Sequence, residues 1–414
     1  MKKALGALIA ADVISTVGTE MTAIALPWFV LVTTGSPARM GAVLAAEFVG
    51  LTVLGLASGR VATVLGPRRT MLTSDALRAG LVALIPALSA LGWLTFPTIL
   101  AIAFVVGGFF PAYQSASRII VAGLVEDDEL RLTRVGGLLN AVNETASFLG
   151  PPLGGLLVVL LGPGPVLLLD AASYGFAFLL VATLVPGTRG SVEEEGTGVL
   201  GGLRYLWRNR PVRRLVAGVA VVEIGFTAII ATAPILALQL TGGLHSGFDT
   251  GGNGGAVVAG WLLGAYGAGS VIGGIASTRA RDTGPRTSVL AVLALTVAAW
   301  GLLLPVPAWG RALAIGGIGV ANGLFMPRFF AGLTAQTPPA LRARVLTSVM
   351  VAISAPGPIG FLGAGFLAQH TGSAWPGLLL VAGSVTVGAA IVLSAYKLSA
   401  QTAMGPPADR EPHL

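Results

Sequence analysis

The sequence predicts an all-α integral membrane protein in which twelve transmembrane helices form two pseudo-symmetric six-helix bundles. Hydrophobic residues make up 54% of the 414 residues, charged residues only 10%, and the mean hydropathy is +0.84. Such a composition is too apolar for a soluble protein of this length. Apolar runs of about 20 residues, the length that crosses ~30 Å of hydrocarbon as a helix, recur throughout the chain. Elements of the first half also return in the second half.

The apolar runs define the predicted spans. They are continuous rather than alternating, which favours helices over the strands of a β-barrel. The first run follows Met1-Lys2-Lys3 and is too long for the apolar region of a cleaved signal peptide, so we expect it to be retained. In order, the spans are expected at residues 5–32, 40–61, 70–94, 98–119, 133–161, 164–186, 213–239, 256–278, 286–306, 310–333, 343–369 and 374–397.

Three pairs of elements carry the internal repeat. At the end of the second span, Gly-Leu-Ala-Ser-Gly-Arg at 55–60 returns as Gly-Ile-Ala-Ser-Thr-Arg at 274–279. In the fourth span, Phe-Phe-Pro at 109–111 returns as Phe-Met-Pro at 325–327. In the first span, the Gly18 and Pro27 pair returns as Gly225 and Pro234. Symmetry between two membrane halves is typical of secondary transporters, whose substrate site lies between halves that rock against each other.

The basic residues predict the orientation. With a cytoplasmic N-terminus, every Lys and Arg except Arg39, Arg78 and Arg311 falls in a tail, an inner loop or an inner span end. This bias predicts a protein of the inner (cytoplasmic) membrane with both termini on the cytoplasmic side. The excess of Arg over Lys suggests a bacterial source. The formal charge of +7 therefore reflects topology, and we expect no nucleic-acid partner. The absence of Cys and the scatter of the three His leave no support for a metal site or a cofactor.

The spans divide the chain into two bundles and a linker. We expect an N-terminal bundle at 1–186, a cytoplasmic linker at 187–212, a C-terminal bundle at 213–398 and a cytoplasmic tail at 399–414. In the linker, Leu203, Tyr205, Leu206 and Trp207 alternate with arginines. This pattern fits a helix that lies in the headgroup layer, and it equally fits a plain basic linker.

The loop after the second span resembles a signature of the major facilitator superfamily. Gly59, Gly66 and the basic pair Arg68 and Arg69 match it, whereas Thr63 and Val64 replace its Asp-Arg pair. The resemblance implies the two-bundle transporter fold, which is usually monomeric in this family. In the family, the Asp of this loop helps to close the cytoplasmic gate, so its replacement by Thr63 implies that this contact is missing here. Asp75 and Arg78, three residues apart, could form a structural pair that substitutes for it.

The fifth span carries a second resemblance. Gly150, Pro151, Gly154 and Gly155 are similar to the Gly-Pro-x-x-Gly-Gly element of antiporters in that family, and the first three spans resemble its macrolide-efflux and enterobactin-exporter branch. Independently of the family, glycines let helices approach closely and prolines bend a span. The element is therefore either a gating seam or ordinary small-residue packing.

Acidic residues within the spans are the sharper functional candidates. Because a charge at mid-bilayer costs about 2.5 kcal/mol or more, a retained carboxyl group is a functional hypothesis by default. Glu20, Glu144 and Glu223 lie nearest mid-depth and are predicted to couple transport to protons; the alternative is a permanently protonated, hydrogen-bonded group. Their helical neighbours and other expected cavity residues are Asp12, Thr16, Thr227, Asn140, Phe110, Tyr113, Gln114, Asn322 and Phe325.

Three functions remain open at this stage. The first is a proton-coupled exporter of small amphipathic molecules, such as a drug or a secreted metabolite. The second is a lipid or lysolipid flippase on the same scaffold. The third is a membrane enzyme or receptor. The sequence contains no Walker loop, nucleophile elbow or metal-ligand cluster, which argues against an enzyme. The expected partners of the first are a small-molecule substrate, protons and the lipid bilayer.

Overall fold

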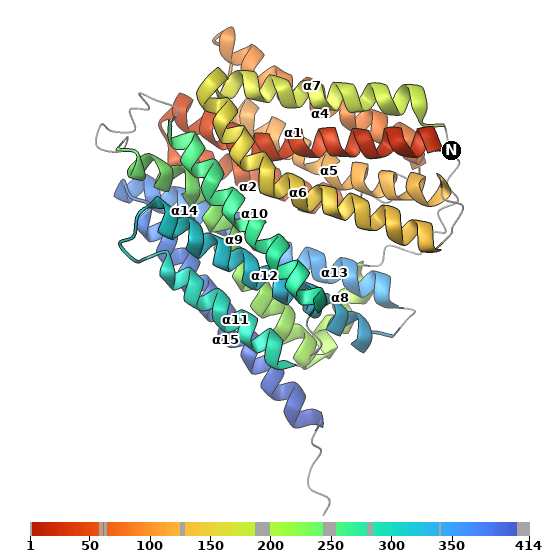
Figure 1. The fold of residues 1–414 in the computed structure, drawn as a ribbon, viewed down its shortest axis with the longest axis vertical. Coiled ribbons are helices and arrows are strands. Elements are labelled where there is room, and N and C mark those ends of the chain that lie inside the picture. Colours follow the sequence, from red (N-terminus) through yellow and green to blue (C-terminus); the bar gives the residue numbers. More distant parts are fainter. Residues whose placement is uncertain are drawn as a thin grey trace, which may run out of the picture.

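The computed structural model describes residues 2–57, 61, 64–124, 129–186, 199–242, 254–279, 285–338 and 341–403, and these residues form helices joined by short turns, with no strand among them (Figure 1). The N-terminal half contains α1 (Lys2–Thr34), α2 (Pro37–Gly55), α4 (Pro67–Ala90), α5 (Phe96–Leu124), α6 (Glu129–Leu161) and α7 (Pro163–Leu184). A short helix, α8 (Val199–Arg208), leads to the C-terminal half. That half contains α9 (Arg210–Leu240), α10 (Gly254–Arg279), α11 (Pro285–Gly301), α12 (Ala308–Gln336), α13 (Arg342–Ser354), α14 (Gly357–Thr371) and α15 (Trp375–Ala403).

The predicted spans are present. Among the described residues, ten helical segments are long and apolar enough to cross a membrane, and two shorter apolar helices, Thr145–Leu161 and Arg286–Gly301, lie within α6 and α11. The eleventh span, however, consists of α13 and α14 rather than one helix. Pro356 stands between them; its missing amide hydrogen and its steric effect on the preceding residue interrupt the helix. The N-terminal ends of α2 and α9 are capped by Ser36 and Asn209, whose side chains accept hydrogen bonds from backbone amides in the first turn of each helix.

The same pairs of helices pack in each half, which confirms the two pseudo-symmetric bundles. Helix α1 packs on α7 as α9 packs on α15, and α2 packs on α5 as α10 packs on α12. The paired glycines of the repeat occupy equivalent contacts: Gly18 faces Ser173 on α7, and Gly225 faces Ser384 on α15. A side chain at either glycine would overlap the facing helix. The repeat seen in the sequence therefore preserves the positions at which backbones come closest.

The two halves meet at one end only. We call the end that carries the N-terminus the proximal end and the opposite end the distal end. One apolar core joins both halves at the distal end and includes Trp28, Ile235 and Phe361. Toward the proximal end each half has a separate core, one around Leu8 and the other around Phe329. Figure 1 shows the bundles converging at the distal end and separating toward the N-terminus.

Glycines line the two most extensive helix contacts between the halves. On one side, Gly41 of α2 faces the backbone of Phe361 on α14. On the other, Gly260 of α10 faces the backbone of Pro151 on α6, and Gly155 of α6 faces the backbone of Ala256 on α10. We call these two contacts the distal seam. The Gly-Pro element of the fifth span therefore lies where the halves touch.

Gly260→Leu is expected to loosen the distal seam, because its side chain would meet the α6 backbone, which cannot yield as a flexible side chain can. Overpacking of this kind costs about 1–3 kcal/mol. A thermal-unfolding scan in detergent should show a lower melting temperature. Gly274→Leu on the same helix is the matched control, because no atom lies near the position of its Cβ. Equal melting temperatures for the two variants would contradict the packing role of Gly260.

Candidate functional site

The N-terminal bundle presents a polar cavity of about 270 Å³ at the proximal end. Helices α1, α5 and α6 line it, with Asp12, Gln114, Arg118 and Asn143 as its main polar groups. Because the halves are joined at the distal end, we call this proximal cavity the cleft site. Asp12 and Gln114 are residues that the sequence predicts for a cavity. Arg118 lies on α5, within electrostatic reach of Asp12.

Glu20 faces α6 rather than the cleft site. Its Oε1 accepts a hydrogen bond of 2.7 Å from the hydroxyl group of Ser147, and a side chain at Gly150 would overlap its Cβ atom. One turn earlier, the Thr16 hydroxyl group lies 3.4 Å from the Asn143 Oδ1 atom. Asn140 and Glu144 also lie on α6, but their side chains are outside the described part. Both readings of Glu20, coupling group and structural hydrogen bond, fit this arrangement.

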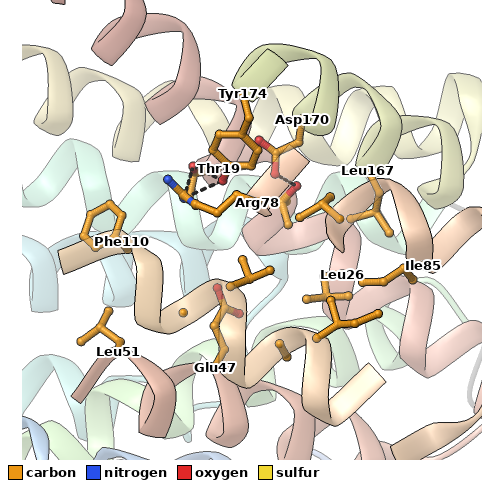
Figure 2. Close-up of a pocket in the computed structure, with 16 residues that line it drawn as sticks. Thr19, Leu26, Glu47, Leu51, Arg78, Ile85, Phe110, Leu167, Asp170 and Tyr174 are labelled. Carbon is orange, nitrogen blue, oxygen red and sulfur yellow. Dashed lines mark hydrogen bonds between the residues drawn. The ribbon is translucent and has the colours of Figure 1, made fainter. Parts of the chain in front are cut away.

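A second cavity, of about 150 Å³, lies inside the N-terminal bundle and is lined by α1, α2, α4, α5 and α7 (Figure 2). It holds three acidic or basic side chains from three helices: Glu47 of α2, Arg78 of α4 and Asp170 of α7. We call it the bundle cavity. Its other walls are mostly apolar and include Phe110, another residue that the sequence predicts for a cavity.

Hydrogen bonds in the bundle cavity do not join the charged groups to one another. Arg78 Nη2 donates to the Tyr174 hydroxyl at 2.6 Å and to Thr19 Oγ1 at 3.2 Å. The guanidinium group also lies over the Tyr174 ring, 4.1 Å from its centroid. Asp170 Oδ2 accepts a hydrogen bond of 2.7 Å from Thr22. The described residues contain no hydrogen bond between Arg78 and Asp170 or Glu47.

The expected pair of Asp75 and Arg78 is not hydrogen-bonded. Asp75 is 0% exposed, and neither of its carboxyl oxygens has a hydrogen-bond partner among the described residues. Arg78 lies one turn further along α4 and bonds to hydroxyl groups instead. Two residues of the loop signature have defined positions. Arg68 donates a hydrogen bond to the backbone carbonyl of Ala182 on α7 at 2.6 Å, and Gly66, with a φ of 81°, is the residue directly before α4. Gly59 lies outside the described residues. Arg69 lies in the first turn of α4.

The C-terminal bundle contains a smaller cavity of about 80 Å³ at the equivalent place. Glu223 and Asn322 line it together, and the Asn322 amide donates to the Tyr266 hydroxyl at 2.7 Å. Among the described residues, the Thr227 hydroxyl group makes no hydrogen bond to the Glu223 carboxyl group. It is buried and donates to backbone carbonyls, that of Gly357 on α14 at 2.8 Å and that of Glu223 itself at 3.0 Å. Among the described residues, Glu223 is the one acidic side chain that lines this cavity, and no Lys or Arg lines it.

Two of the aromatic residues expected in a cavity are packed in the cores. Phe325 stacks on Phe329, with ring centroids 6.0 Å apart, inside the proximal core of the C-terminal bundle. Tyr113 lies in the corresponding core of the N-terminal bundle. Within the described residues, no group of His, Cys, Asp and Glu is arranged to hold a metal ion.

The bundle cavity is a site that the positions of residues along the predicted spans do not indicate. Counting from the span ends separates Glu47 and Asp170, expected toward the outside, from Arg78, expected toward the inside. That count follows Cα positions, whereas a long Arg side chain carries its charge several ångströms away from its own depth. The sequence feature that could have indicated this site is the presence of Glu47, Arg78 and Asp170 within predicted spans of the same bundle.

Because the chain has no native cysteine, single cysteines can report which positions face water. Gln114→Cys and Asn143→Cys in the cleft site should react with a membrane-impermeant methanethiosulfonate added to the proximal side. Ala116→Cys should stay unlabelled, since Ala116 is buried on the same helix as Gln114. Equal labelling of all three positions would argue against the cleft site.

Comparison with known proteins agrees with the fold. The family model described as Major Facilitator Superfamily matches residues 8–258. The chain is 25% identical over 381 residues to the multidrug efflux pump Tap of Mycobacterium tuberculosis, covering 88% of this chain and 87% of the relative. It is 27% identical over 368 residues to Tap of Mycolicibacterium fortuitum, covering 86% and 87%.

Solved transporters share the architecture. The nucleoside transporter NupG superposes with a TM-score of 0.71 at 13% identity, covering 96% of this chain and 100% of the other. A bacterial homologue of the human lysosomal transporter Spinster, in an inward-facing and unoccupied conformation, gives a TM-score of 0.70 at 13% identity with 98% of each chain covered. The inward-open xylose transporter XylE of E. coli gives 0.67 at 14% identity, covering 94% and 95%. With a family model that matches more than half of its length, this chain belongs to the Major Facilitator Superfamily and is a transport protein, not an enzyme.

Proposed function

We propose that the protein exports small amphipathic molecules from the cytoplasm in exchange for protons, by alternating access. The observation that carries this proposal is the cleft site, where Asp12 and other polar groups lie at the proximal end of halves that are joined distally. Relatives that cover most of the chain are named multidrug efflux pumps, which supports export and a broad substrate class. In this proposal the protein is a monomer in a bacterial inner membrane with both termini on the cytoplasmic side. The cleft site then opens toward the cytoplasm.

The cleft site suits a molecule with one polar end and an apolar body. Asp12 offers a carboxylate to a cationic group, and Gln114 and Asn143 offer amides for hydrogen bonds. Leu139 and Val121 supply apolar contact within the same cavity. Arg118 partly balances the charge of Asp12, so a neutral polar group is also accommodated. Recognition by few polar groups and mixed apolar walls permits chemically varied substrates.

Transport can be tested with everted membrane vesicles that contain the protein and a fluorescent lipophilic cation, ethidium. Protons that leave an acidified vesicle lumen should drive ethidium into these vesicles, and an ionophore that dissipates the proton gradient should stop this uptake. Vesicles without the protein provide the background. Uptake that persists unchanged after the gradient is dissipated would exclude proton coupling, and no uptake of any amphipathic probe would exclude the exporter.

Asp12→Asn should weaken the transport of cationic probes, because it removes the negative charge of the cleft site. We expect the KM for ethidium to rise about tenfold, which corresponds to the loss of about 1.4 kcal/mol of binding. The uncharged probe N-phenyl-1-naphthylamine should show a much smaller change in the same vesicles. An equal loss for both probes would contradict a charge-based role and indicate general damage.

Glu20→Gln should reduce proton-driven export at least tenfold while leaving the protein folded, because Gln keeps the shape and hydrogen bonding of Glu but cannot change charge. The same loss is expected for Glu144→Gln, with a weaker effect for Glu223→Gln. Ser147→Ala distinguishes the two readings of Glu20, since it removes the 2.7 Å hydrogen bond and keeps the carboxyl group. A purely structural role for Glu20 would be favoured if the Glu20→Gln variant exported at the parental rate. The same conclusion would follow if Ser147→Ala by itself abolished proton-driven export.

A further inference from the structure

The bundle cavity is separate from the cleft site and contains more charge than its counterpart in the other half. Its acidic and basic side chains are Glu47, Arg78 and Asp170, whereas one acidic side chain, Glu223, and no basic one lines the equivalent cavity among the described residues of the C-terminal bundle. Burying three ionisable groups costs several kcal/mol for each ion unless they compensate one another. An arrangement this costly needs an explanation that apolar packing does not provide.

Arg78 is not committed to either carboxyl group. It is 2% exposed, donates to the neutral hydroxyl groups of Tyr174 and Thr19, and its Nε atom has no hydrogen-bond partner among the described residues. Asp170 is stabilised by Thr22 at 2.7 Å and by Ser173 at 3.3 Å.

Glu47 differs from Asp170. Its carboxyl group points into the cavity in Figure 2, and within the described residues it makes no hydrogen bond. It remains close enough to Arg78 and Asp170 to interact electrostatically with both. The cavity thus contains one carboxyl group that is satisfied and one that is not.

Charge balance identifies what this cavity would bind. Two ionised carboxyl groups and one guanidinium group leave one net negative charge in a low-dielectric space, and one added positive charge restores neutrality. An ionised Glu47 would attract the guanidinium group more strongly than two neutral hydroxyl groups do. The observed bonds of Arg78 to hydroxyl groups therefore fit a neutral, protonated Glu47.

We propose that the bundle cavity is a proton-binding site in which Glu47 takes up the proton and Arg78 is its mobile counter-charge. The inference rests on the proposed proton-coupled function and assigns the proton a site away from the substrate. When Glu47 loses its proton, Arg78 turns toward it and releases Thr19 and Tyr174. Because Thr19 lies on α1 and Tyr174 on α7, this exchange of partners alters how two helices are held against α4.

Other titratable groups connect this site to the cleft site. Asp75, one turn before Arg78 on α4, is buried with no hydrogen-bond partner in the described part of the chain, and it interacts electrostatically with Arg78 and with Asp12. Asp12 lines the cleft site. The order Asp12, Asp75, Glu47 therefore gives a proton stepwise acceptors from the proximal cleft to the cavity. Tyr113 and Tyr174, both buried, are the phenols that face this group of charges.

The test measures proton binding without any substrate. Purified protein in detergent is titrated between about pH 5 and 9, and infrared difference spectra record the carbonyl band of protonated carboxyl groups. We expect Glu47→Gln to bind one proton fewer than the parent and to lose one such band. Thr52→Val is the matched control on the same helix, because the one hydrogen bond of the Thr52 hydroxyl group to a described residue goes to the backbone carbonyl of Phe48 at 2.9 Å; this variant should match the parent. An identical proton count for folded Glu47→Gln would overturn the inference.

A second measurement separates this inference from the proposed function. In liposomes that contain the pH dye pyranine, ethidium should drive proton movement through the parent and the Thr52→Val protein, and at least tenfold less through Glu47→Gln. Asp170→Asn provides an independent variant if Glu47→Gln melts at a lower temperature, with the same expected loss. Proton-coupled transport that is unchanged in both variants would overturn the site and leave the exporter standing. A parent protein that binds the extra proton yet moves no ethidium-coupled protons would support the site and overturn the coupled function.

Discussion

The distal seam is the contact on which the rest of the arrangement depends. Lipid tails are as apolar as the side chains that face them, so helices in a bilayer gain little from hydrophobic association and are held by close van der Waals packing. Gly260 against α6 and Gly41 against α14 let backbones approach at the two places where the halves touch. Closure at the distal end leaves the proximal ends apart, with a separate apolar core in each. The cleft site exists because these contacts lie at one end only.

Symmetry supplies the scaffold, and a few substitutions supply the chemistry. Equivalent helices enclose a cavity in both bundles, and Ile102 and Phe110 of one correspond in the repeat to Ile318 and Met326 of the other. The polar groups do not correspond. The N-terminal cavity holds Arg78 with two acids, whereas the C-terminal cavity holds Glu223 beside a hydrogen-bonded amide and phenol. The halves therefore share packing and differ in electrostatics, as expected when function resides in particular side chains.

The sequence predicts the fold well because membrane insertion reads local hydropathy, and local hydropathy is visible in a single chain. It also predicts where Gly18 and Gly225 matter, since close backbone contact tolerates no larger residue. The break at Pro356 was visible in principle, because proline cannot continue a helix without losing a hydrogen bond.

The candidate site is less predictable, because it depends on helix rotation. Span counting gives the depth of Glu20 but not that it faces Ser147, and it separates Glu47 from the guanidinium group that lies near it. Thr227 shares a helical face with Glu223, yet its hydroxyl group bonds across to α14. Hydrogen-bond partners on other helices are set by tertiary packing, and a hydropathy pattern carries no information about them.

Helix α1 connects the three features that alternating access requires. It carries Asp12 in the cleft site, Thr19 at the Arg78 side chain, and Glu20 against α6, the helix that forms half of the distal seam. A change in the partners of Arg78 would therefore act on the helix that also lines the cleft site and packs against α6. Since a packed interface moves between discrete arrangements rather than deforming continuously, a small local change of charge can bias the position of the whole helix. In the proposed exchange, proton and substrate need no direct contact with each other, because both would act on α1.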